Sequence, residues 1–261
     1  MCLVAIAWRA HPRYPLVIVA NRDEDHGRPA APAAWWPDAS QVFGGRDLRA
    51  GGSWLAVSRS GRFAAITNNP RRPPGPQPGP SRGQLVQDYV AGDRPSGRFL
   101  DGVQAKADRY PGFCLLVGTR VQVRGIVTPP GSHPGRWTLP AGVSAVSNSP
   151  LEQPWPKVHY REAALAAALA DDAVEPGRLF ALLERRDPVP GQGSGGDRDD
   201  SPAISRLPFI VGEHYGTRAS TVITMDAAGS CEVSERRFDS TGRLQGEVSE
   251  QIGRASCRER V

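Results

Sequence analysis

Short β-prone runs that come in pairs, each pair joined by a tight polar turn, most constrain how this chain of 261 residues can fold. Val, Ile, Leu and Phe favour strands, whereas Gly, Pro, Asn and Ser between the runs favour turns. The paired runs are 3–7 with 16–20, 53–57 with 62–67, 113–117 with 121–126, and 221–225 with 231–238, and a further strand is expected at 143–147. Since tight turns join antiparallel strands, the sequence predicts antiparallel sheets.

Two pairs of helices interrupt these strands. The expected helices cover 83–90, with Ser81 as its N-cap, then 97–107, and later 160–170 and 177–185. Two stacked sheets between two helical layers would cover both faces of each sheet. The sequence therefore predicts an α+β fold, a four-layer αββα sandwich of two antiparallel sheets, in a single domain over residues 1–251.

The Gly and Pro residues gather in a few stretches, which predicts long loops. Loops are expected at 29–37 and 71–80, and a flexible insertion at 188–202. The pairs Gly44-Gly45 and Gly51-Gly52 match neither a P-loop nor a dinucleotide-binding fingerprint, so we interpret them as turns.

Charge and cysteine usage exclude several classes of function. The formal net charge of +5 comes from basic residues spread along the chain, which argues against a nucleic-acid partner. No run approaches the roughly 20 apolar residues of a membrane span. The cysteines lack a C-x-x-C pair and the histidines lack ligand spacing, so we expect a reduced, cytoplasmic protein with no metal and no cofactor.

The last residues, Ile252–Val261, resemble an in-frame translation of a common sequencing adapter. We therefore expect residues 252–261 not to be native and exclude them from fold reasoning. The alternative is a genuine basic tail.

Cys2 is the residue that points most directly to chemistry. If Met1 is removed, Cys2 carries a thiol and an α-amine on one carbon. An α-amine titrates near ~8, so it can act as general base to its own side chain. The alternative is a strand cysteine that only packs, which is how we interpret Cys114 and Cys231.

Asn21-Arg22-Asp23-Glu24 places an amide, a cation and two carboxylates at the expected exit of an apolar strand. In a hairpin this cluster would lie beside Cys2. There Arg22 would favour the thiolate and a carboxylate could orient the α-amine. The alternative is a surface salt-bridge cluster.

Several blocks, in order along the chain, together resemble the NRDE family, also called transport and Golgi organisation 2-like proteins. The blocks are Met1-Cys2, Asn21-Arg22-Asp23-Glu24, Gly44–Leu48, Gly52–Leu55, Gly61–Ala64, Thr67-Asn68, Ser81–Gly83, Gly112-Phe113, Leu115–Gly118, Ser147-Asn148, Pro154–Val158 and Tyr215–Val222. The resemblance implies an N-terminal nucleophile hydrolase type of fold, with penicillin V acylase and conjugated bile acid hydrolase as cysteine amidase relatives.

The resemblance also implies a set of catalytic residues. The amidases have an N-terminal Cys, then an Arg and an Asp, an Asn after a later strand, a second Asn followed closely by Pro, and a late Arg. The residues that match this order are Cys2, Arg22, Asp23, Asn68, Asn148 and Arg218. One departure matters: the amidases separate Arg and Asp by two residues, whereas Arg22 and Asp23 are adjacent. Neighbours on a regular strand face opposite ways, so Glu24 or Asp25 is the alternative partner of Arg22.

Two functions follow. The first is a cysteine N-terminal nucleophile hydrolase that cleaves a linear amide or related acyl bond, with Asn68 and Asn148 as oxyanion donors. The alternative is a non-enzymatic protein that binds and traffics haem, lipid or acyl-CoA with the same fold. The expected partner is therefore a small acyl or amide substrate, or an amphipathic ligand.

Overall fold

The computed structural model describes residues 2–69, 79–128, 134–171, 174–191 and 203–253. The chain divides into two compact units, each built on one sheet. The six-stranded unit holds Met1–Gly27, Ala141–Ala227 and Glu232–Glu250, and the seven-stranded unit holds Arg28–Pro140, Ala228–Cys231 and Gln251–Val261. Among the described residues, no helix has the length and apolar character needed to cross a membrane.

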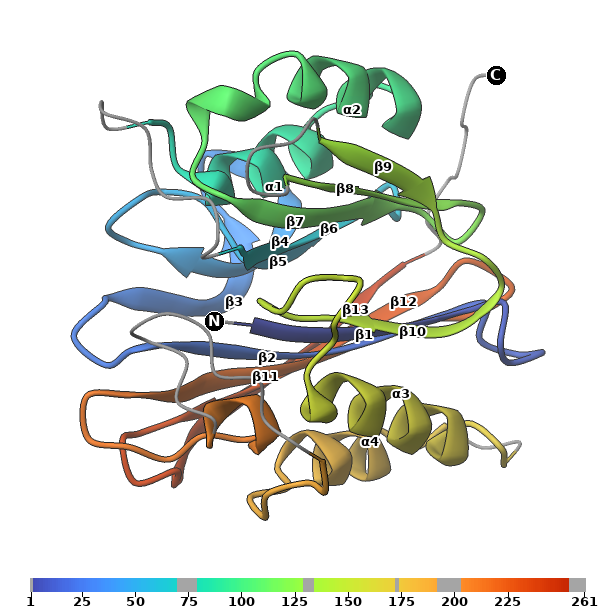
Figure 1. Ribbon diagram of the computed structural model, residues 1–261. Coiled ribbons are helices and arrows are strands. Elements are labelled where there is room, and N and C mark those ends of the chain that lie inside the picture. Colours follow the sequence, from blue (N-terminus) through green and yellow to red (C-terminus); the bar gives the residue numbers. More distant parts are fainter. Residues whose placement is uncertain (1, 70–78, 129–133, 172–173, 192–202, 254–261) are drawn as a thin grey trace. The chain divides into compact units, whose positions relative to one another are not determined.

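The sheet of the six-stranded unit brings together strands from both ends of the chain. Its order is β10 (Gly142–Val146), β1 (Cys2–Trp8), β2 (Leu16–Asp25), β11 (Tyr215–Met225), β12 (Cys231–Phe238) and β13 (Leu244–Ile252). The helices α3 (Pro156–Ala168) and α4 (Pro176–Leu183) cover one face (Figure 1). Val17 and Val19 of β2 pack with Leu165 and Leu183 of these helices. Alternate residues of β2 therefore point toward the helices, and those between them point to the other face.

The seven-stranded unit is built mainly from consecutive segments. Strands β3 (Ala30–Trp36), β4 (Ala39–Asp47), β5 (Leu55–Ser58), β6 (Phe63–Asn68), β7 (Phe113–Gly118), β8 (Val123–Val127) and β9 (Gly135–Thr138) lie side by side in chain order, and each neighbouring pair is antiparallel. The helices α1 (Arg82–Ala91) and α2 (Ser96–Gln104) cover one face. As predicted, Ser81 caps α1, with its side chain accepting from the Gly83 amide.

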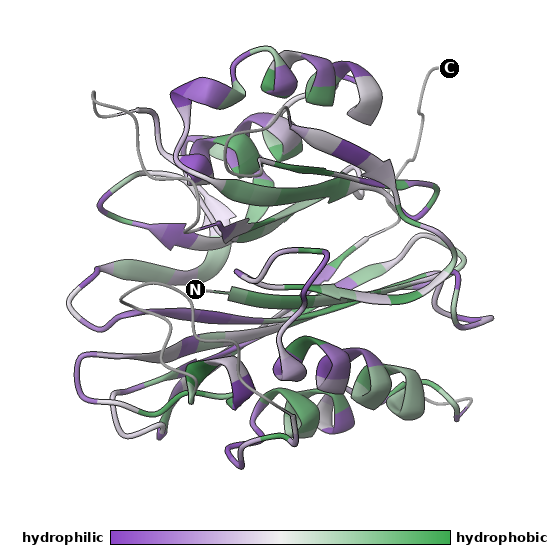
Figure 2. Cartoon of the chain, in the orientation of Figure 1, coloured by the Kyte–Doolittle hydropathy of each residue, from purple (hydrophilic) through white to green (hydrophobic). Residues whose placement is uncertain are grey.

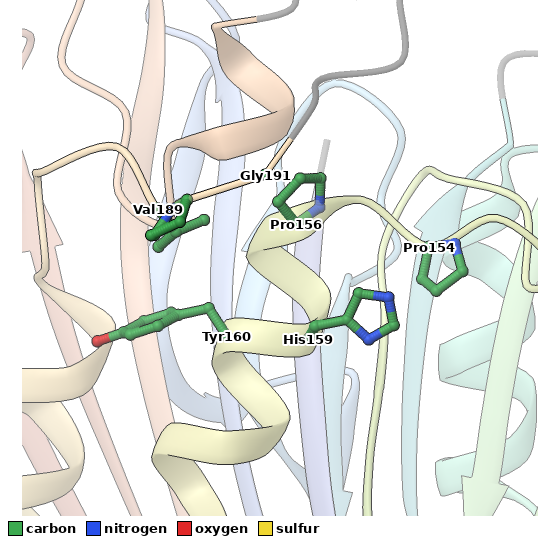
Figure 3. Close-up of a pocket in the computed structure, with 7 residues that line it drawn as sticks. Pro154, Pro156, His159, Tyr160, Val189 and Gly191 are labelled. Carbon is green, nitrogen blue, oxygen red and sulfur yellow. The ribbon is translucent and has the colours of Figure 1, made fainter.

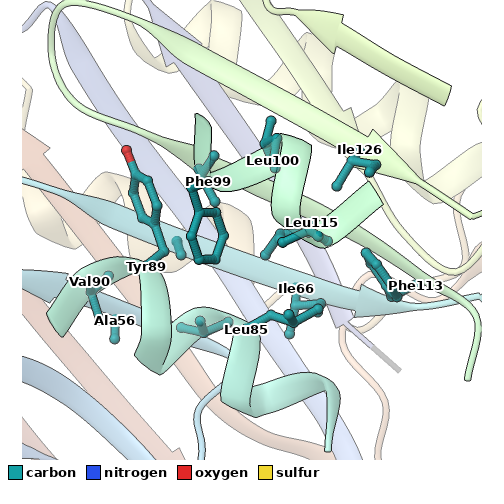
Figure 4. Close-up of a cluster of buried hydrophobic side chains, with 14 of the residues drawn as sticks. Ala56, Ile66, Leu85, Tyr89, Val90, Phe99, Leu100, Phe113, Leu115 and Ile126 are labelled. Atoms are coloured by element: carbon teal, nitrogen blue, oxygen red, sulfur yellow. The ribbon is translucent and has the colours of Figure 1, made fainter. Parts of the chain in front are cut away.

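The core of the seven-stranded unit forms between α1, α2 and the sheet (Figure 4). Leu85 and Tyr89 from α1 and Phe99 from α2 meet Ile66 and Leu115 from the strands. The strands beneath the helices are largely hydrophobic, whereas the helices carry both hydrophobic and hydrophilic residues (Figure 2). Burial of this core is the main favourable contribution to the stability of such a layer.

The predicted hairpins and the two helix pairs are confirmed, but several predictions for the chain between them are wrong. The expected loop at 29–37 is strand β3, which tolerates Pro32 because β3 lies at the sheet edge. Gly44-Gly45 lies inside β4 rather than in a turn. A Cβ on Gly44 would lie 2.8 Å from the Leu55 carbonyl oxygen, so glycine permits close approach to β5. Strands β9 and β13 were not predicted.

Two further predictions stay open. The first is that residues 1–251 form a single domain; it depends on how the two compact units combine. The flexible insertion at 188–202 falls largely on residues 192–202, which lie outside the described residues, although Val189 is buried and Ile204–Arg206 forms a 3-10 turn.

Candidate functional site

The register of β1 against β2 brings Cys2 and Arg22 directly opposite one another. Residues opposite one another in an antiparallel pair point to the same face of the sheet. Cys2 is half-buried, and Arg22 is buried at 3% exposure. The proximity that the sequence predicted for these two residues is therefore present in the six-stranded unit.

Asn148 contacts the backbone of Cys2. Strand β10 pairs with β1 and ends at Val146, so the following residues reach the start of β1. The Cys2 amide donates to Asn148 Oδ1 at 3.1 Å. The turn after Val146 is fixed because Ser147 and Ser149 hydrogen-bond each other at 2.9 Å. Asn148 is thus a buried residue whose oxygen faces the Cys2 nitrogen.

Arg22 forms an ion pair with Glu24, two residues further along β2. Arg22 Nη2 lies 3.7 Å from Glu24 Oε2. Strand β2 runs on to Asp25, so the expected strand exit at Asn21 is wrong. Because side chains alternate along a strand, Arg22 and Glu24 share a face and Asp23 points to the opposite one.

Asp23 is held from the β11 side. It lies opposite Thr217, whose Oγ1 donates to Asp23 Oδ1 at 2.6 Å. Asp23 is buried at 1% exposure. Burial lowers the pKa of Arg161 on α3, and the charge of Asp23 opposes this lowering. Asp23 therefore belongs to the face that α3 and α4 cover.

Arg218 lies at a β-bulge in β11. Thr217 pairs with Asp23 and Ala219 with Arg22, which leaves Arg218 as the extra residue. Bulges re-aim side chains, and Arg218 Nη1 donates to the Asp25 carbonyl oxygen at 2.9 Å. Burial and the charge of Arg22 lower the pKa of Arg218.

Asn68 lies in the other unit, at the last position of β6 and opposite Phe113 of β7. It is half-buried, and the next residue, Asn69, donates from Nδ2 to the Thr128 carbonyl oxygen at 3.0 Å. The six-stranded unit thus contains Cys2, Arg22, Asp23, Asn148 and Arg218 of the predicted set.

The pKa of the Cys2 thiol is raised from its usual value, mainly by burial. The amino-terminal charge and then Arg22 lower the pKa, whereas Asp23 and Glu24 raise it. Arg22 lowers the pKa of the Cys2 thiol, as expected, but burial raises this pKa by more than Arg22 lowers it. The resting site therefore favours the thiol over the thiolate at neutral pH.

The sequence predicted no role for three polar residues of the six-stranded unit. Burial and the charge of Asp23, followed by that of Cys2, raise the pKa of Tyr215. Arg161 is fully buried on α3, where burial lowers its pKa to about 10, and Lys157 is buried at 1% exposure. The available signal was a basic residue on the apolar face of a predicted helix, which is rarely buried without a role.

The described residues hold no group of three or more His, Cys, Asp or Glu side chains arranged to bind a metal. A pocket of about 510 Å³ lies at the start of α3 (Figure 3). It is lined by Pro154, Pro156, His159, Tyr160, Val189, Pro190 and Gly191. These lining residues include none of the candidate catalytic residues.

Known sequences match nearly the whole chain. The family described as Transport and Golgi organisation 2 matches residues 1–240. A Transport and Golgi organization protein 2 homolog from Bos taurus is 32% identical over 263 residues, covering 90% of this chain and 92% of the relative. The Mus musculus homolog is 28% identical over 258 residues, with the same coverage of each chain.

Solved structures match the fold. A mutant of the conjugated bile acid hydrolase from Clostridium perfringens has a TM-score of 0.57 and 7% identity, covering 96% of this chain and 92% of that chain. The Caenorhabditis elegans N-acylethanolamine-hydrolyzing acid amidase ortholog has a TM-score of 0.50 and 11% identity, covering 85% of this chain and 92% of that chain. These likenesses confirm the predicted α+β fold class.

Proposed function

The chain belongs to the Transport and Golgi organisation 2 family, and from the geometry around Cys2 we propose that it is a cysteine N-terminal nucleophile hydrolase that cleaves a linear amide or related acyl bond. The observation that carries this proposal is the hydrogen bond from the Cys2 nitrogen to Asn148 Oδ1, with Arg22 opposite Cys2. A cysteine that only packs has no need of a buried amide that holds its backbone nitrogen.

The nucleophile forms once Met1 is removed and the Cys2 nitrogen becomes an α-amine. Asn148 Oδ1 then accepts from this amine where it now accepts from the amide. The neutral amine takes the thiol proton and the sulfur attacks the carbonyl carbon. Since burial raises the pKa of Cys2, the thiol keeps its proton until the amine removes it during attack.

Asn148 also supplies a donor for the oxyanion. Its Oδ1 faces the Cys2 nitrogen, which leaves Nδ2 as the group able to donate to the developing negative charge. Asn68, by family resemblance, is the second donor. Each such donor is worth ~3 kcal/mol of transition-state stabilisation in well-studied enzymes.

The protonated amine gives its proton to the leaving nitrogen, and the carbon–nitrogen bond breaks to leave an acyl thioester on Cys2. Water then attacks the thioester and releases the acid and the free thiol. The names of the two structural neighbours, an N-acylethanolamine-hydrolyzing amidase and a conjugated bile acid hydrolase, support an acyl amide as the substrate class.

A trapping experiment tests this function. The protein is incubated with N-acyl amides, lactones and acyl thioesters, and peptides are mapped by mass spectrometry. We expect an acyl adduct on Cys2, none on Cys2→Ala, and roughly 100-fold slower formation on Asn148→Ala. Cys114→Ala is the matched control, because it removes a thiol from the other unit and should leave the adduct unchanged.

Two outcomes would contradict the proposal. Retention of Met1 on most molecules, measured by intact mass, would remove the amine base. Equal binding of haem or acyl-CoA by wild type and Cys2→Ala, with no adduct from any compound, would instead favour the binding and trafficking role.

A further inference from the structure

The four residues Asn21 to Glu24 separate into two pairs because they lie on a continuous strand. β2 has no extra residue in this stretch. Arg22 pairs with Cys2 of β1, and Asp23 pairs with Thr217 of β11, beside the bulge that leaves Arg218 as the extra residue of β11. Asn21 and Asp23 point toward the helices, whereas Arg22 and Glu24 point to the face of Cys2. The two pairs have different partners.

Asn21 and Asp23 fasten residues 207–210 to the sheet. Asn21 Nδ2 donates to the carbonyl oxygens of Pro208 at 2.8 Å and Leu183 at 2.9 Å. Asn21 Oδ1 accepts from Ser220 Oγ at 2.7 Å, so the amide uses both of its ends.

Thr217 extends this connection to Asp23. Its Oγ1 accepts from the Ile210 amide at 2.9 Å and donates to Asp23 at 2.6 Å. The hydroxyl donates its one proton to Asp23 Oδ1 and its oxygen accepts from the Ile210 amide, so Thr217 links the two. Arg161 contributes from α3 by donating to the same Pro208 carbonyl at 3.3 Å.

The other pair lies on the Cys2 face. Arg22 is opposite Cys2, and Glu24 is its partner at 3.7 Å. Glu24 also acts on Arg218, because its charge raises the pKa of that guanidinium against the lowering by Arg22. Asp25 raises the pKa of Arg218 as well, so Glu24 and Asp25 together oppose the lowering by burial and by Arg22.

We propose that Glu24 is the positioning carboxylate of the Cys2 site, holding Arg22 across from Cys2, and that Asn21 and Asp23 form a structural clamp for residues 207–210. The role assigned to Glu24 rests on the proposed hydrolase function. In that function Glu24, and not the expected Asp23, is the carboxylate beside the nucleophile. The charge of Asp23 raises the pKa of Cys2 more than that of Glu24 does. A buried charge is poorly screened, so it can act through the sheet without contact.

The test compares Glu24→Gln with Thr217→Val, and uses Thr128→Val as matched control. Thr128 is a buried hydroxyl in the other unit that accepts from the Phe113 amide at 2.8 Å. The readouts are the pH profile of Cys2 alkylation by iodoacetamide, the melting temperature, and hydrogen exchange at the Ile210 amide. Alkylation needs no acyl substrate, so this test remains readable if the hydrolase proposal fails.

We expect Glu24→Gln to lower the melting temperature by a few degrees, because the buried Arg22 loses this ion-pair partner. It should also move the alkylation midpoint to lower pH, with labelling about 2–5-fold faster below the wild-type midpoint, and leave exchange at the Ile210 amide unchanged. Thr217→Val should lower the melting temperature by about 2–5 °C and speed exchange at Ile210 roughly tenfold, without moving the midpoint. Thr128→Val should lower the melting temperature and change neither of the other readouts.

The reverse pattern would overturn the proposal. If Thr217→Val moves the alkylation midpoint and Glu24→Gln does not, Asp23 and not Glu24 is the positioning carboxylate of the Cys2 site. Glu24→Asp, which keeps the charge, should retain the wild-type profile. It supplies the measurement if Glu24→Gln does not fold, because a shifted profile in a folded Glu24→Asp protein would equally count against the proposal.

Discussion

The two units bury charge very differently. Among the described residues, the buried charged side chains of the six-stranded unit are Arg22, Asp23, Lys157, Arg161 and Glu235. The seven-stranded unit buries Arg62, which donates to the carbonyl oxygens of Tyr89 and Arg94. Burying ions costs several kcal/mol each unless partners compensate. Of these side chains, Arg22 and Asp23 act on the pKa of the Cys2 thiol, so part of this cost falls at the candidate site.

The two units also differ in how far apart in the sequence their neighbouring strands lie. The seven-stranded sheet is built from neighbours in chain order, whereas β2 of the six-stranded sheet pairs with β11, nearly two hundred residues later. Local hairpins can be recognised from alternating apolar residues and turns. Chemistry that depends on distant strands requires the whole six-stranded unit to be assembled first.

The largest expected effect comes from removing a buried arginine in each unit. Arg161→Met leaves the Leu182 and Pro208 carbonyl oxygens without this donor and removes a cation near Asp23. It should cost about 3 kcal/mol, measured by denaturant unfolding. It should also slow Cys2 alkylation, because the charge of Asp23 would then be less balanced.

Arg62→Met is the control from the other unit. It should also destabilise the protein, since Arg62 bonds two carbonyl oxygens, but should leave Cys2 alkylation unchanged. Equal slowing of Cys2 by both variants would show that general loosening, and not local charge, controls the thiol.

The second prediction compares thiols in the two units. Cys2 is half-buried, whereas Cys114 is buried at 3% exposure and burial raises its pKa to about 12. Iodoacetamide should therefore label Cys2 at least ~10-fold faster than Cys114 in the native protein. Peptide mass spectrometry over time measures both rates, and comparable rates would argue against an accessible nucleophile at Cys2.

The fold could be predicted from the sequence wherever hydrophobic alternation was clear. The hairpin of β1 and β2 was expected because apolar runs flank a polar turn. Strand β13 has the sequence LQGEVSEQI and is largely exposed, so it lacks that signal. Strand β3 contains Pro32, which normally argues against a strand and is tolerated only at an edge.

The site could be predicted only as a set of residues. Position alone identified Cys2, and the motif identified Arg22. The register that sets Arg22 opposite Cys2, and the bulge at Arg218, depend on strand pairings that no local pattern specifies. Arg161 was missed because its partners are backbone carbonyl oxygens, which carry no sequence signal.

The third prediction concerns alkaline stability of the seven-stranded unit. The folded Cys114 has a pKa of about 12, above the unfolded value, so the folded state holds a proton that the unfolded state loses near pH 9. This contribution is complete below about pH 9 and is lost as the pH rises toward 12. At pH 10 the loss should amount to about 1 kcal/mol.

Cys114→Ala should flatten the fall in unfolding free energy between pH 8 and 10. Val117→Ala, a truncation on the same strand without a titrating group, should keep the wild-type slope while lowering stability at both pH values. An unchanged slope in Cys114→Ala would assign the alkaline loss to other groups.

The smallest effect is expected at the carboxyl end, where the predicted non-native segment begins at Ile252. The structure places Ile252 at the end of β13 with 2% exposure. Deleting residues 253–261 should therefore leave the melting temperature unchanged. Deleting Ile252 as well should lower it by a few degrees at most, because one buried aliphatic side chain is lost from a strand end. Thermal unfolding of the two truncations beside the full chain measures this difference, and a large fall on removal of 253–261 alone would show that the tail contributes to the fold.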